Sequence, residues 1–200
     1  MIMNGYILAL KPGSKARAPV LVLVYHEPGG DDSRVRQIAA ALGATAMTIG
    51  QLRSARLGPG DSVALLMPMR GGHYHEVEEV VLGWGASWLG RMPPSLTARA
   101  VARAARARGC GSVTLYYWRA RRFAEEQEED LREIERLLEG EGLRIAECGE
   151  CVAPLSLLGG RLLEEAAELA RRCSARLLEP LAYLVEPSDL LEWLGPASRA

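Results

Sequence analysis

Two apolar runs without alternation constrain the fold of this chain more than any other feature. One occupies residues 20–25, and the other occupies residues 62–69. A strand with one face in water alternates apolar and polar residues, whereas continuous runs are typical of strands buried on both faces of a parallel sheet. The sequence therefore predicts an α/β protein with parallel sheets.

Both runs lead to a histidine beside a glycine-rich turn. His26 directly follows the first run, and His73 follows Gly71 and Gly72 after the second. Ligands of parallel sheets bind at the carboxyl ends of the strands, so we expect the two histidines to share one site. His75 joins them only in an extended turn, because on a helix it points away from His73. Imidazole is both a common metal ligand and a general base.

The remaining strand and helix signals occur in an order that is repeated. We expect further strands at residues 44–49, 86–92, 112–118, 143–146 and 152–158, and an apolar stretch at 6–10. Helices are predicted at residues 33–42, from 73, at 95–108, at 123–138 and from Arg161. The repeat predicts two flavodoxin-like or Rossmann-like halves, residues 1–109 and 110–200. Trp118 and Arg161 then occupy the positions of His26 and His73 and line a cleft between the halves.

Composition excludes several classes of function. A formal net charge of -1 gives no support for nucleic-acid binding, which draws on a concentrated basic surface. No apolar stretch reaches the ~20 residues of a membrane span, and we expect a cytoplasmic protein without a membrane partner. The four cysteines are too few for a disulfide-built scaffold. Cys148 and Cys151 form a C-x-x-C pair that suits a metal site or a redox dithiol, but inert thiols are the favoured interpretation.

The order of these motifs resembles the class II chelatases, in particular the sirohydrochlorin cobaltochelatases. The resemblance is carried by His26 after an apolar strand, by His73 after a proline-containing strand and a glycine pair, and by Pro93-Pro94 before a helix. It implies two halves related by a pseudo-twofold axis, with a degenerate second half. The implied activity is that of a lyase that inserts a divalent metal into sirohydrochlorin in cobalamin or tetrapyrrole biosynthesis. The metal substrate would be cobalt, or nickel or iron in its place, and no organic cofactor is expected.

The resemblance assigns His26 and His73 as catalytic metal ligands, either of them also serving as the base for the pyrrole protons. Arg70, Gly71 and Gly72 are expected to bind the carboxylates of the tetrapyrrole through a guanidinium and free backbone N–H groups. Arg70 as a solvated surface residue is an equally weighted alternative. Glu27 and Glu76 are secondary candidates for a ligand or a proton acceptor. The protein would be a monomer, as a fused pseudo-dimer, or a homodimer.

Two alternative functions stay open at this point. Glu27-Pro28 follows His26 where the family usually has Gly-Ser, which favours a carrier or sensor of a metal or tetrapyrrole without turnover. The second alternative is an unrelated flavodoxin-like module that binds a nucleotide or a protein partner. Neither a G-x-G-x-x-G motif nor a Walker loop follows the first strand, which argues against a nucleotide.

Overall fold

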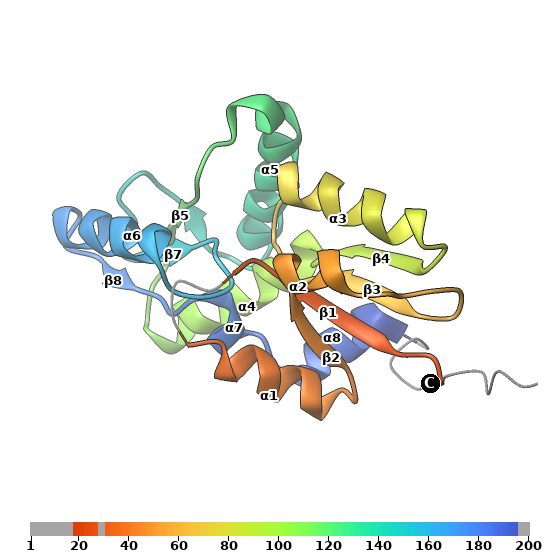
Figure 1. Cartoon of the computed structure of the whole chain (residues 1–200). Coiled ribbons are helices and arrows are strands. Elements are labelled where there is room, and N and C mark those ends of the chain that lie inside the picture. Colours follow the sequence, from red (N-terminus) through yellow and green to blue (C-terminus); the bar gives the residue numbers. More distant parts are fainter. Residues whose placement is uncertain (1–17, 28–30, 196–200) are drawn as a thin grey trace, which may run out of the picture.

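Two four-stranded parallel sheets form the framework of the computed structural model, which describes residues 18–27 and 31–195. The first sheet has the order β2-β1-β3-β4 and contains β1 (Leu21–Tyr25), β2 (Thr45–Thr48), β3 (Ser62–Leu65) and β4 (Ser87–Arg91). The second has the order β6-β5-β7-β8 and contains β5 (Ser112–Tyr116), β6 (Arg144–Ile145), β7 (Cys151–Pro154) and β8 (Arg176–Leu177). The predicted α/β class with two parallel sheets is confirmed (Figure 1). The apolar stretch expected at residues 6–10 lies outside the described residues.

The helices connect the strands in the order that parallel pairing requires. Five of them match predicted helices: α1 (Ser33–Ala41), α3 (Gly72–Gly83), α4 (Pro94–Ala107), α5 (Ala124–Gly140) and α6 (Arg161–Arg172). Four short elements were not predicted: β8, α2 (Ile49–Ser54), α7 (Leu181–Leu184) and α8 (Pro187–Leu194). Such short segments carry too few residues to show a periodic pattern. A turn of 3-10 helix, η1 (Arg121–Phe123), precedes α5.

The same strand order in both sheets shows the internal repeat that the motif order predicts. All five residues of β1 and all four residues of β7 are buried, as expected for strands near the centre of a covered sheet. Each sheet reverses its strand order between two central strands, β1 and β3 in one and β5 and β7 in the other. Ligands bind at the carboxyl ends of such strands.

One apolar core connects the two sheets. Leu23 of β1, Val101 of α4 and Ile134 of α5 belong to the same buried cluster as Ala153 of β7. Helix α4 presents small side chains that include Ala102 to this core, so that neighbouring helices can pack closely against it. Figure 1 shows α4 and α5 between the two sheets.

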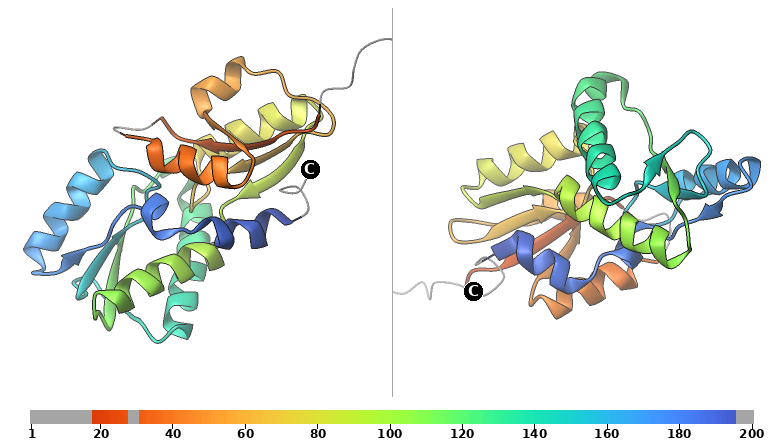
Figure 2. Two further views of the ribbon diagram at one scale, coloured as in Figure 1. Left: turned by 90° about the horizontal axis from the view of Figure 1, so that it is seen from below. Right: turned by 180° about the vertical axis from the view of Figure 1, so that it is seen from behind.

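The C-terminal helices return to the first half of the chain. Arg34 Nε of α1 donates to the carbonyl oxygen of Ala182 at 3.1 Å. Arg103 of α4 donates to Leu184 O at 2.6 Å and pairs with Asp189 of α8. Figure 2 shows α7 and α8 beside α1 and α4. The chain passes from the first sheet to the second between α4 and β5. The division into domains at residues 1–109 and 110–200 stays a prediction, because elements of both parts pack together.

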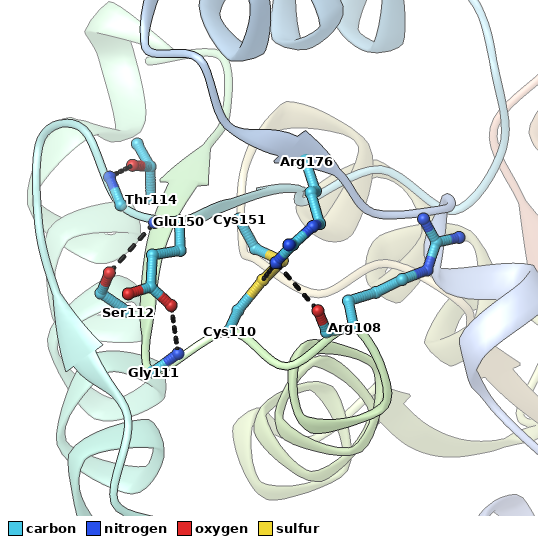
Figure 3. The surroundings of a disulfide bond; sticks show 9 residues. Arg108, Cys110, Gly111, Ser112, Thr114, Glu150, Cys151 and Arg176 are labelled. Atoms are coloured by element: carbon cyan, nitrogen blue, oxygen red, sulfur yellow. Dashed lines mark hydrogen bonds between the residues drawn. A yellow bond between two sulfur atoms is a disulfide. The ribbon is translucent and has the colours of Figure 1, made fainter.

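All four cysteines form disulfides, which corrects the prediction of inert thiols. Cys110 bonds Cys151 (Figure 3). Cys148 bonds Cys173, so the two cysteines of the C-x-x-C pair have different partners. The first disulfide joins β5 and β7 at their amino ends, opposite the end where ligands are expected. These pairs join segments 41 and 25 residues apart in sequence, a separation that the short motif does not reveal.

None of the helices in the described part of the chain is both long and apolar enough to cross a membrane. The cytoplasmic location stays a prediction.

A buried carboxylate on α5 fixes the loop that follows β3. The Asp130 side chain is 3% exposed and accepts hydrogen bonds from Arg70 N at 2.7 Å, Arg70 Nε at 2.9 Å and Arg91 Nη2 at 2.6 Å. The hydrogen bond to Asp130 raises the pKa of the Arg70 guanidinium above its ordinary value, although burial opposes it. One acidic side chain of the second half thus holds two basic residues of the first.

We expect Asp130→Asn to lower the free energy of unfolding by about 3 kcal/mol, because it leaves two guanidinium groups without their buried counter-charge. Urea unfolding followed by circular dichroism measures this loss. Glu129→Gln is the matched control, since Glu129 also pairs with Arg70 but is 63% exposed, and its loss should stay below about 1 kcal/mol. Equal losses in the two variants would contradict the role given to Asp130.

Candidate functional site

A pocket of about 420 Å³ opens at the carboxyl ends of the central strands of both sheets. The loop after β3 and the corresponding loop after β7 form facing parts of its wall. Most of its lining is apolar and comes from these two loops and the first turn of α6: Leu66, Met67, Pro68, Met69, Leu155, Leu157, Leu158 and Leu162. The repeat therefore places equivalent loops of the two sheets around one cavity.

The two histidines expected to share a site both line this pocket. The ring centroids of His26 and His73 lie 4.8 Å apart. His26 Nδ1 lies 2.9 Å from the carbonyl oxygen of Glu27, and His73 Nδ1 lies 3.3 Å from Glu76 Oε2. A carbonyl and a carboxylate only accept hydrogen bonds, so each Nδ1 is the protonated nitrogen of the neutral ring. Nε2 of each ring then carries the free lone pair.

The Glu76 carboxylate that orients His73 is itself held by a guanidinium. Glu76, one turn further along α3, receives a hydrogen bond from Arg53 Nε of α2 at 2.6 Å. A carboxylate on the far nitrogen of an imidazole fixes its tautomer and its orientation, as in the bases of many active sites. Glu76 therefore acts through His73. Arg53 was not predicted as a residue of the site.

The carboxylate of Glu27 fixes the turn that carries His26. Glu27 Oε1 accepts a hydrogen bond of 2.5 Å from the backbone N–H of Gly50 in the first turn of α2. Burial raises the pKa of Glu27, but hydrogen bonds from backbone N–H groups outweigh this effect and lower the pKa below its ordinary value. A Cβ at position 50 would lie 2.6 Å from the same oxygen, so glycine is needed for this contact. Glu27 thus anchors a loop, and its carboxylate is engaged.

His75 does not join the other two histidines. Its Nε2 lies 2.9 Å from Glu126 Oε2 of α5, and its ring stacks on Phe123 with centroids 5.0 Å apart. The helical turn that begins α3 directs the side chain away from the pocket, as helix geometry predicts. His75 is therefore a natural control for experiments on the other two.

All three residues expected to bind ligand carboxylates, Arg70, Gly71 and Gly72, line the pocket. Gly71 and Gly72 line the pocket where α3 begins. The guanidinium of Arg70 is held by α5, through Asp130, Glu129 and the carbonyl oxygen of Glu126. These acceptors occupy part of its guanidinium, and its role in binding substrate carboxylates stays a prediction. The sequence alone does not reveal partners about 60 residues away.

The facing wall is organised by one carboxylate on α6. Glu165 accepts hydrogen bonds from Trp118 Nε1 at 2.8 Å, the Tyr116 hydroxyl at 2.9 Å and Arg161 Nε at 2.9 Å. Trp118 and Arg161 line the pocket, where the repeat predicts them. Half of the Trp118 surface is exposed, so the indole is available to a ligand. Glu165 was not predicted as a site residue, although its spacing from Arg161 suits an ion pair on one helix face.

The described residues contain no group of three or more histidines, cysteines or acids arranged to hold a metal ion. Of the three histidines, His26 and His73 line the pocket. Metal binding by His26 and His73 stays a prediction, and the described residues place no third ligand beside them.

No family model and no curated protein matches this chain. Solved structures with similar topology include an arylmalonate decarboxylase, with a TM-score of 0.35, 14% identity and coverage of 90% of this chain and 92% of that chain. The maleate isomerase Iso from Pseudomonas putida S16 has a TM-score of 0.35, 10% identity and coverage of 91% and 97%. A LacI family transcriptional regulator from Mycobacterium smegmatis has a TM-score of 0.38, 14% identity and coverage of 88% and 91%. These scores are too low to carry an inference about activity.

The assignment to the class II chelatases is wrong, because no family model matches this chain. The solved structures named above are not chelatases either, and insertion of cobalt or a related metal into sirohydrochlorin is not supported. Apolar strands that end at a glycine-rich turn are a general feature of parallel α/β proteins, because glycine permits tight turns where ligands bind at the carboxyl ends of the strands. The motifs identify the position of a site and not its reaction.

We expect the indole N–H signal of Trp118 to report the ionisation of Glu165. Hydrogen bonds from Trp118, Tyr116 and Arg161 lower the pKa of Glu165 below its ordinary value of 4.5. The carboxylate therefore keeps these partners until the pH falls below that value. In a proton–nitrogen NMR titration, the Trp118 signal should move with a midpoint below pH 4.5, and this movement should vanish in Glu165→Gln. A midpoint above that value would contradict the arrangement.

Proposed function

We propose that the pocket is the active site of an enzyme that transfers protons on small organic acids. One observation carries this proposal: two imidazoles lie together, and both have Nδ1 directed to an acceptor. Each neutral ring offers Nε2 as a base, and a ring that has gained a proton is an acid. A pair of such groups can remove a proton from one atom of a substrate and return it to another.

The charge of the pocket favours an anionic substrate. Helices α3 and α6, each of 12 residues, begin at the pocket, and each has a glycine as its N-cap residue. The first N–H groups of a helix lack partners within the helix, and the helix dipole places partial positive charge there. The charge of Arg161 at the rim is paired with Glu165, and the charge of Glu76 is paired with Arg53, so the helix N-termini carry this preference. Glu27 keeps its negative charge, and Glu27 Oε1 accepts a hydrogen bond from Gly50 N.

The size and lining of the pocket favour a small molecule with an apolar part. A volume of about 420 Å³ lies within the range of small-molecule sites. The leucine and methionine side chains of the two loops offer no hydrogen bonds, and the exposed face of Trp118 suits a flat or apolar group. A carboxylate at a helix N-terminus with an acidic C–H next to the imidazoles satisfies all of these features.

A binding protein without turnover is the second candidate function. The apolar lining favours it, because retention of a ligand needs apolar contact and no base. The two candidates share a ligand class and differ only in whether a proton moves.

Deuterium exchange into carbon acids tests the proposal. Pyruvate and phenylpyruvate are incubated with the protein in D2O, and the loss of their C3 proton signals is followed by NMR. We expect faster exchange than in buffer, and a loss of this acceleration of about 100-fold or more in the double variant His26→Gln/His73→Gln.

His75→Gln is the matched control, since it removes an imidazole of the same helix that lies outside the pocket, and it should keep full acceleration. Equal acceleration in the double variant would contradict the assignment of the base. Ligand-induced shifts of pocket signals without exchange would support the binding protein. Absence of both binding and exchange would contradict this substrate class.

A further inference from the structure

The two disulfides differ in their access to solvent. Cys110 is 4% exposed and Cys151 is fully buried. Cys148 is exposed and Cys173 is half-buried. Thiol–disulfide exchange requires that an external thiolate reach one of the two sulfur atoms. Only the disulfide between Cys148 and Cys173 meets this condition.

A guanidinium further covers the buried disulfide. Arg176 Nη1 lies 3.7 Å from Cys110 Sγ and donates to the carbonyl oxygen of Arg108 at 2.9 Å (Figure 3). The side chain is thereby held against the sulfur. The disulfide between Cys110 and Cys151 is protected both by burial and by this cover.

The exposed disulfide anchors a helix that has few fully buried side chains. Only Ala166 and Ala170 of α6 are buried, and they pack with Val152 in a small cluster apart from the main core. Alanine buries little apolar surface, so it stabilises the helix less than a leucine would. Cys173 lies at the end of α6, and its bond to Cys148 ties that end to the segment before β7.

The other end of the same helix forms part of the pocket. Arg161 and Leu162 line the cavity, and Glu165 holds the indole of Trp118. A change in the stability of α6 therefore reaches the pocket wall directly.

We propose that the disulfide between Cys148 and Cys173 is a thiol–disulfide exchange site, and that its opening loosens α6 and the pocket wall while the disulfide between Cys110 and Cys151 stays closed. The co-reactant is a dithiol. Its first thiolate attacks one sulfur, the S–S bond breaks, and the other cysteine leaves as a thiolate that takes up a proton. Its second thiolate then attacks the mixed disulfide and releases the first cysteine. The dithiol becomes a disulfide, and two electrons and two protons pass to the protein. This proposal does not depend on the proposed function.

Thiol trapping tests which disulfide opens. The full chain is incubated with increasing concentrations of dithiothreitol, alkylated and digested, and the labelled cysteines are quantified by mass spectrometry. We expect Cys148 and Cys173 to be labelled at least about tenfold faster than Cys110 and Cys151. Equal labelling of all four, or faster labelling of Cys110 and Cys151, would overturn the proposal.

Amide hydrogen exchange tests the effect on α6. In the native chain, opening of the exposed disulfide should speed exchange of residues 161–172 at least about tenfold. In the variant Cys148→Ser/Cys173→Ser, the amides of α6 should exchange fast before any reductant is added. Dithiothreitol should not change that rate. Cys110→Ser/Cys151→Ser is the matched control and should keep the response. Unchanged exchange of α6 after labelling of Cys148 and Cys173 would overturn the link to the pocket.

Discussion

The position of the pocket depends on one buried ion pair network between the two halves of the chain. Asp130 of α5 holds both Arg70, in the loop after β3, and Arg91, at the end of β4. Burial of a carboxylate is costly, and paired guanidinium groups offset that cost only in one geometry. The loop between Leu65 and Gly72 is therefore fixed relative to α5. Helix α3, which carries His73, begins directly after this loop. The network therefore also fixes the position of one wall of the pocket.

The internal repeat explains why a single pocket has two chemically different walls. Equivalent loops follow β3 and β7, and the equivalent helices α3 and α6 each have a glycine as N-cap residue. The first wall carries two imidazoles, each oriented through Nδ1. The second carries an indole and a guanidinium, both held by Glu165. The repeat places the starts of two helices at the cavity. In the function that we propose, the imidazoles transfer protons and the second wall contacts the ligand.

The sequence allowed much of this to be predicted where the signal is local. Continuous apolar runs predicted the parallel strands, and motif order predicted that His26 and His73 share a site and that Trp118 and Arg161 line it. Partners that come from distant segments could not be predicted. Arg53 beside Glu76, Asp130 beside Arg70 and the pairing of all four cysteines depend on how helices pack, which short motifs do not encode. The same limit explains the incorrect chelatase assignment, because its motifs describe a sheet edge and not a reaction.

The tautomers of His26 and His73 are the most direct test of this view of the site. Long-range proton–nitrogen NMR of the imidazole rings distinguishes protonated from unprotonated ring nitrogens in the neutral form. We expect both rings to carry the proton on Nδ1 and to leave Nε2 unprotonated, with both Nε2 signals shifting together when an organic acid binds. A proton on Nε2 of either neutral ring, or a ligand shift confined to one histidine, would contradict a shared acid–base site.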